Sequence, residues 1–241
     1  MDEPHGTVDK DQHKEVHLKS SVFITDIVIG MSDGLTVPFA LAAGLSGTVH
    51  SNAIIITAGI AEIVAGSIAM GLGGYLAGKT AQEHFQAELK REYDEVEKIP
   101  ENEKEEVRLV FASYGLNEIT QNIVVEELAK DKDKWVDFMM KNELGLEKPE
   151  DNRARNSAAT IGISYIVGGL IPLSAYFFSH TPVQGLFISA SLTVICLFIF
   201  GYFKSKATGQ PPMKGALKVT LIGIVAASAA FIVAKIFNNL F

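Results

Sequence analysis

Five stretches of the chain are long and apolar enough to cross a lipid bilayer, and they constrain the fold more than any other feature. They cover roughly residues 21–45, 53–78, 157–178, 183–203 and 215–238. A span needs about 20 mainly apolar residues. In lipid each span must be helical, because a helix satisfies its own backbone hydrogen bonds. The sequence therefore predicts an all-α integral membrane protein with five transmembrane helices.

Charged residues divide the rest of the chain. Residues 80–155 contain 20 Asp and Glu against 12 Lys and Arg, whereas the apolar stretches contain few charges. A single soluble domain would mix the two kinds of residue. We therefore expect four parts: an N-terminal tail (1–20), transmembrane helices 1 and 2 (21–79), a helical metal-binding insert (80–155) and transmembrane helices 3 to 5 (156–241).

The insert has clear helix signals. Residues 81–98 lack Gly and Pro, so they should continue the second span as a helix until Pro100. A second helix should follow and end near Gly115, a residue typical of helix C-termini. Asn117 can cap the next helical stretch, which extends over one or two helices.

The distribution of basic residues predicts the orientation. Of 21 Lys and Arg, all but Lys235 lie in the tail, between residues 79 and 155 or in the loop at 204–218, and neither short hairpin loop has one. Basic residues remain on the cytosolic side. The N-terminus and the insert should therefore be cytosolic, and five spans place the C-terminus on the other side.

The overall composition excludes some partners and sites. The formal net charge of −7 disfavours nucleic acid, because phosphate binding needs clustered basic residues. The only cysteine, Cys196, allows no disulfide within the chain and no thiolate metal cluster.

Acidic residues inside the first two spans indicate an ion path. Asp26 and Asp33 are seven residues apart and share one helix face, and the second span contains Glu62 and Met70. A carboxylate at the bilayer centre costs about 2.5–3.5 kcal/mol on insertion scales, so it is usually functional. The alternatives are that each acid is a protonated packing residue or bonds a neighbouring polar group, and that Met70 fills space.

The insert contains a second set of candidate ligands. Glu92 with Glu95, and Glu103 with Glu106, form E-x-x-E pairs whose carboxylates share a helix face. Two such helices could join four carboxylates around divalent cations. Methionine and one more acid follow at helical spacing: Met139, Met140 and Glu143. The alternatives are a solvated acidic surface and methionines that belong to the core.

These residues together resemble the vacuolar iron transporter family, and the chain looks like a plant member. The resemblance covers nearly the whole length. It is carried by "DIVIGMSDGLTVPFALAAGL" in the first span, "AGIAEIVAGSIAMGLGGYLAGK" in the second, the E-x-x-E insert and three further spans.

The resemblance implies a homodimer in the vacuolar membrane that exchanges cytosolic Fe²⁺ for protons, with the ion path at the dimer interface. Asp33 and Met70 would coordinate the ion, and Glu62 and Asp26 would act nearby. The insert would bind metal through Glu92, Glu95, Glu103, Glu106, Glu143, Met139 and Met140. No cofactor is expected besides the transported or bound Fe²⁺, with Mn²⁺, Co²⁺, Ni²⁺ and Zn²⁺ as other candidate ions.

Three other functions are alternatives. The same architecture could transport mainly manganese, since affinity order alone does not decide between the two metals. The insert could serve as a membrane-anchored iron buffer or sensor. A di-iron oxidase would be an enzyme, but such sites use Glu-x-x-His pairs. The insert has no such pair, and we expect no enzymatic activity.

Overall fold

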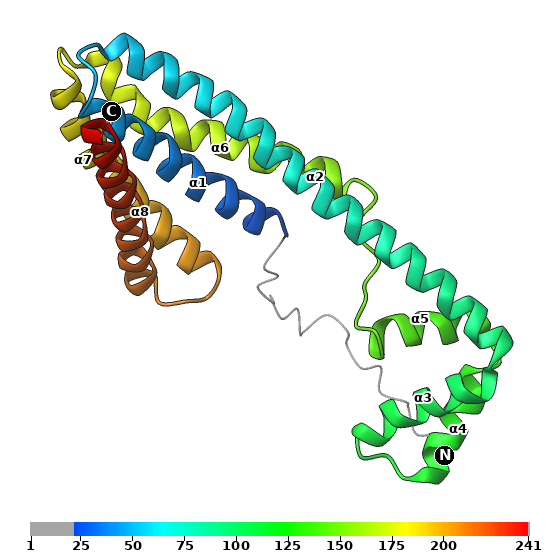
Figure 1. The fold of residues 1–241 in the computed structure, drawn as a ribbon. Helices are drawn as coiled ribbons and strands as arrows, with labels where there is room; N and C mark the ends of the chain where they lie inside the picture. The colour runs from blue at the N-terminus through cyan, green and yellow to red at the C-terminus, as the bar shows by residue number, and fades with distance from the viewer. Residues whose placement is uncertain (1–21, 241) are drawn as a thin grey trace, which may run out of the picture. The chain divides into compact units, whose positions relative to one another are not determined.

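The computed structural model describes residues 22–240, so the predicted tail at 1–20 lies outside the described residues. Helices account for all of the regular structure in this range (Figure 1). They are α1 (Val22–Ser46), α2 (Asn52–Lys98), α3 (Pro100–Ser113), α4 (Glu118–Leu128), α5 (Lys132–Asn142), α6 (Arg153–Phe178), α7 (Pro182–Ala207) and α8 (Pro212–Leu240). The chain divides into two compact units, and Ala69–Ala159 form the second.

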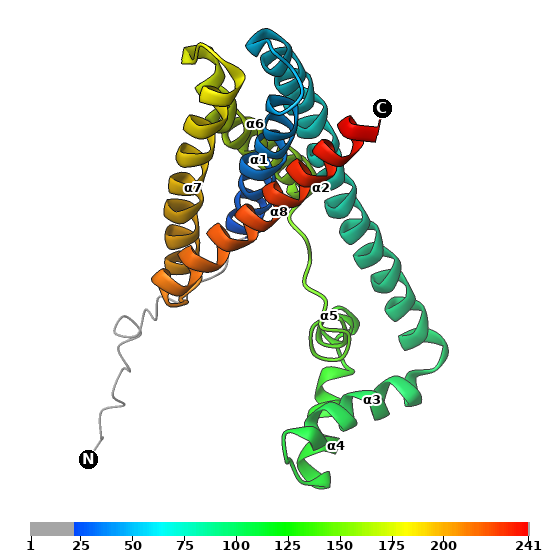
Figure 2. The same cartoon turned by 60° about the vertical axis from the view of Figure 1, so that its left-hand side comes forward.

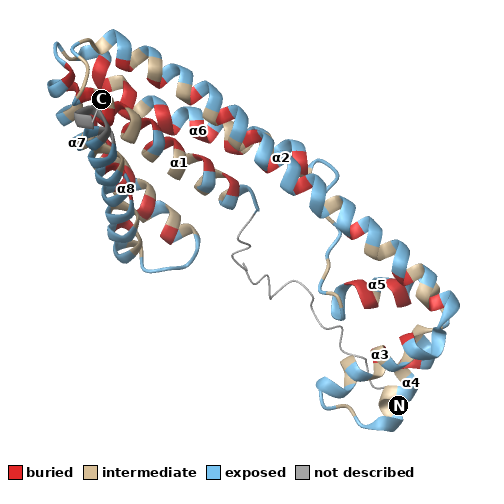
Figure 3. Ribbon diagram, in the orientation of Figure 1, coloured by how far each residue is buried: buried red, intermediate tan, exposed pale blue. Residues whose placement is uncertain are grey.

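Five helices have the length and apolar composition of membrane spans, as the sequence predicts. They are α1, α2, α6, α7 and α8. Within the first unit, α1 packs against α7 and α8, and α7 packs against α8 (Figure 2). Many large apolar side chains on these helices are exposed, including Phe187, Phe203 and Leu221. Figure 3 shows long stretches of exposed residues on α2 and α8. Such a surface is expected of helices that face lipid or another apolar partner.

Glycines bring α1 and α6 close together. A Cβ atom at Gly30 would lie 2.3 Å from the carbonyl oxygen of Ile161, and one at Gly34 would lie 2.4 Å from the carbonyl oxygen of Tyr165. No larger residue fits at either position without moving a backbone. This is the close approach that small residues permit between membrane helices.

The second unit contains the insert, and its helices form where the sequence predicts them. α2 ends at Lys98 and Pro100 opens α3, since proline suits the first helical turn. Gly115 follows the C-cap with a φ of +82°, and the Asn117 side chain accepts a hydrogen bond from the Thr120 backbone N–H at 2.9 Å. The sequence predicts one or two helices after Asn117, and the structure has two, α4 and α5.

A small hydrophobic core holds these helices together. Its buried residues come from α2, α3, α4 and α5. They are Phe85, Val96, Val107, Val125, Trp135, Val136, Met139 and Met140. Trp135 is the only tryptophan in the chain and is 4% exposed, so its fluorescence reports on the packing of this unit.

Candidate functional site

Two acidic residues lie on the face of α1 that contains the tightly packed glycines. Asp26 is buried, Asp33 is half-buried, and Gly30 between them packs on the α6 backbone. This face of α1 therefore turns toward other helices of the first unit.

Glu62 on α2 is linked to α6. Its Oε1 atom accepts a hydrogen bond from the Tyr165 hydroxyl at 2.5 Å. Its Oε2 atom is buried and has no hydrogen-bond partner among the described residues. Gly34, the residue after Asp33 on α1, packs on the backbone of Tyr165. The first unit therefore joins the acid of α2 to a tyrosine of α6, and the stretch of α1 that contains Asp33 packs on the same tyrosine.

Met70 follows Glu62 by eight residues on α2 and is half-buried. It belongs to the second unit, whereas Asp33 belongs to the first. Its part in an ion path remains a prediction.

Five carboxylates of the insert gather in the second unit, and we call them the acidic cluster: Glu92, Glu95, Glu103, Glu106 and Glu143. Oxygen atoms of Glu92, Glu95 and Glu103 lie within 4.8 Å of one another, close enough to share one metal ion. Glu92 and Glu103 are buried, and each has an Oε2 atom with no hydrogen-bond partner among the described residues. Buried anionic oxygens without partners are costly unless a cation or proton neutralises them.

The acidic cluster raises the pKa of its own members. Desolvation, followed by the charges of Glu106, Glu92, Glu95 and Glu143, raises the pKa of Glu103 to about 7. Glu143 is exposed as a residue, but partial desolvation of its carboxyl group, then the charges of Glu106 and Glu92, also raise its pKa to about 7. Both shifts favour the protonated form while no metal is bound.

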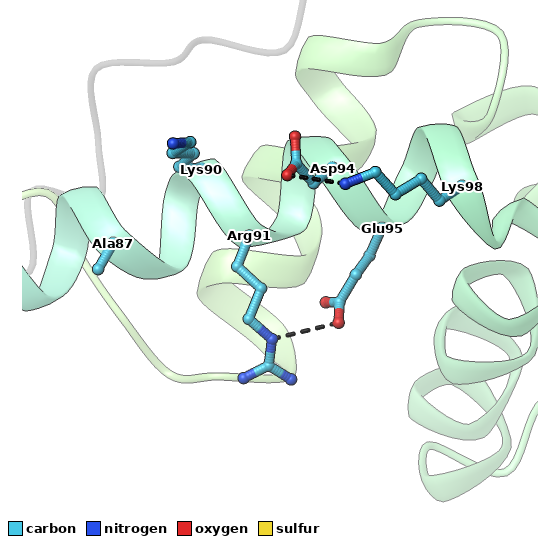
Figure 4. Close-up of a pocket in the computed structure, with 6 residues that line it drawn as sticks. All are labelled: Ala87, Lys90, Arg91, Asp94, Glu95 and Lys98. Atoms are coloured by element: carbon cyan, nitrogen blue, oxygen red, sulfur yellow. Dashed lines mark hydrogen bonds and ion pairs between the residues drawn. The ribbon is translucent and has the colours of Figure 1, made fainter.

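A basic side chain faces one member of the acidic cluster. The Arg91 Nε atom donates a hydrogen bond to Glu95 at 3.2 Å, and a second nitrogen lies 3.5 Å from Glu88. Lys98 contacts Asp94 instead (Figure 4). All of these residues lie on α2, so their spacing of three or four residues accounts for the contacts.

The two methionines of the predicted metal site lie in the hydrophobic core of the second unit. Met139 has no exposed surface and Met140 is 2% exposed. Core packing thus explains both positions, and thioether ligation stays a prediction.

The family model described as "VIT family" matches residues 24–235. The chain belongs to the VIT family. It is 51% identical to Vacuolar iron transporter 1 of Eucalyptus grandis over 225 residues, which cover 93% of this chain and 90% of that protein. Identity to Vacuolar iron transporter 1 of Tulipa gesneriana is 49%, over 93% and 91% of the two chains. For the Arabidopsis thaliana protein of that name the identity is 47%, over 98% and 95%.

Two functional candidates of this VIT-family chain, Tyr165 and Arg91, are not among the residues predicted from the sequence. Tyr165 was visible as a polar residue inside an apolar stretch, but its partner is 103 residues away in the chain. Arg91 stands four residues before Glu95 on a predicted helix, so that contact was accessible from spacing.

Proposed function

We propose that this chain exports ferrous iron from the cytosol into the vacuole in exchange for protons. Membership of the VIT family supports iron as the cargo, since the relatives above are named as vacuolar iron transporters. The observation that carries the ion path is the buried Glu62 Oε2 atom, which has no hydrogen-bond partner among the described residues. An intramembrane carboxylate of this kind marks an ion or proton route.

In the proposed mechanism, Asp33 replaces water lost by the dehydrating Fe²⁺ ion. Two copies of the chain would place two Asp33 carboxylates on the path, and Asp26 and Met70 would add contacts. When the ion leaves toward an acidic lumen, protons neutralise the vacated carboxylates. Deprotonation on the cytosolic side restores them, which couples metal export to proton return.

The acidic cluster would capture metal from the cytosol before transport. Hard carboxylate oxygens bind Fe²⁺ and Mn²⁺ alike, so this part of the chain does not decide between them. Competition between the two metals in the uptake assay below would decide which one is the cargo.

The test is uptake of Fe²⁺ into proteoliposomes that contain the full chain, with and without a pH gradient acid inside. We expect gradient-dependent uptake by the wild type. Asp33→Ala should stop it, and Glu92→Ala with Glu95→Ala should slow it. Equal uptake by Asp33→Ala would refute the proposed path.

The second candidate function is a membrane-anchored iron buffer or sensor. The observation that favours it is the acidic cluster: one oxygen each of Glu92, Glu95 and Glu103 lie within 4.8 Å of one another in one compact unit. It predicts no gradient-driven uptake and the opposite order of severity when iron binding by the full chain is measured. Loss of Glu92 and Glu95 would then abolish function, while Asp33→Ala would be harmless.

A further inference from the structure

Two tyrosines of α6 are fully buried and have different hydroxyl partners. Tyr165 is 2% exposed and Tyr176 is 1% exposed. The Tyr176 hydroxyl shares a hydrogen bond of 2.9 Å with the neutral Ser46 hydroxyl, whereas the Tyr165 hydroxyl donates to the carboxylate of Glu62. Only the Tyr165 hydroxyl therefore bonds an ionisable side chain.

The surrounding backbone makes room for Tyr165. A Cβ atom at Gly66 would lie 2.5 Å from its hydroxyl oxygen. Gly66 lies one helical turn after Glu62 on α2, so the tyrosine reaches the acid across a surface that has no side chain. On α1, Gly34 packs on the backbone of the same residue. Three helices of the first unit thus meet at Tyr165.

The two oxygens of Glu62 differ in their hydrogen bonding. Oε1 is held by the tyrosine, and Oε2 is buried with no hydrogen-bond partner among the described residues. A carboxylate fixed through one oxygen cannot rotate freely, so its second oxygen keeps one direction. Fixed polar groups stabilise a passing charge without the cost of reorganising at that moment.

We propose that Tyr165 is the positioning residue of the ion path: its hydroxyl holds Glu62 Oε1 so that Oε2 receives the ion or proton. This rests on the proposed transport function, which gives Glu62 its role. The hydroxyl acts only through Glu62, while the ring fills the space above Gly66. Tyr165→Phe removes the first contribution and keeps the second.

The first readout is spectroscopic and needs no transport. In pH-induced infrared difference spectra of the full chain, the carboxyl band that is absent from Glu62→Gln belongs to Glu62. We expect Tyr165→Phe to shift the frequency of this band, because the hydrogen bond to that carboxyl is lost. Tyr176→Phe, the matched control on the same helix, should leave it in place. An unshifted band in Tyr165→Phe would overturn the proposal.

The second readout is Fe²⁺ uptake. Tyr165→Phe should lower the rate about ten-fold, a loss that a buried acceptor left without its hydrogen bond can cause. Tyr176→Phe should stay within about two-fold of the wild type, and adding Tyr165→Phe to Glu62→Gln should change the rate less than about two-fold. Full uptake by Tyr165→Phe, or an equal loss in Tyr176→Phe, would refute the positioning role. A wild type without gradient-driven uptake would instead refute the transport function, while the infrared result still decides the hydrogen bond.

Discussion

Metal binding by the acidic cluster should weaken steeply between pH 8 and pH 6. Glu103 is buried with a pKa raised to about 7, so at pH 7 about half of the metal-free molecules have this carboxyl group protonated. A metal ion must displace that proton to use the carboxylate. For one group with this pKa, the apparent affinity falls about ten-fold between pH 8 and pH 6. If Glu143 is displaced independently, the fall becomes about 100-fold.

The assay is calorimetric titration of the full chain with Fe²⁺ without oxygen, at several pH values. Repeating it in two buffers of different ionisation enthalpy counts the protons released. We expect about one proton at pH 7 from Glu103 and Glu143 together, and about 0.2 at pH 8. The control is Glu118→Gln, which should leave this pH dependence unchanged because Glu118 is exposed and is not part of the acidic cluster. An affinity that is equal at pH 6 and pH 8 would refute the raised pKa.

The same raised pKa has a consequence for stability. The Glu103 carboxyl binds its proton more tightly in the folded state than in the unfolded state. The stabilisation of the folded state by this proton is therefore fully present below about pH 4.5 and is lost as the pH rises through about 7. Above pH 7 the ionised Glu103 lowers the free energy of unfolding of the metal-free protein by about 1–3 kcal/mol. Glu103→Gln should therefore stabilise the metal-free second unit at pH 8 and not at pH 4. Thermal unfolding followed by Trp135 fluorescence measures this, and equal melting temperatures at pH 8 would contradict it.

Two further predictions concern packing and charge. Gly34→Ala should lower the melting temperature in detergent, because its Cβ would meet the α6 backbone at a cost of about 1–3 kcal/mol. Gly73→Ala is the control: its Cβ meets nothing within 4 Å and alanine favours the helix, so equal effects of the two substitutions would refute the close approach. Arg91→Gln should raise metal affinity about two-fold at low salt, because the guanidinium competes for Glu95, and added salt should abolish the gain. Lys98→Gln should leave the affinity unchanged, and a gain of the same size there would mean that only net charge matters.

Much of the fold is readable from the sequence because it depends on local rules. The five spans follow from the length of apolar stretches, and the insert helices follow from Pro100 and Asn117. Even the Arg91 contact with Glu95 is a matter of helical spacing. Each of these features involves residues within a few turns of one another, so no packing arrangement has to be known.

The candidate sites depend on more than local rules. The sequence by itself determined which residues are acidic inside the spans and that E-x-x-E pairs lie on helices. Only the tertiary structure decided that oxygens of Glu92, Glu95 and Glu103 lie within 4.8 Å of one another, and that Tyr165 bonds Glu62. The reason is that helix periodicity places residues on a face, whereas the partner of that face depends on how helices distant in the chain pack. For Glu62 that packing is set by the glycines that let Tyr165 approach.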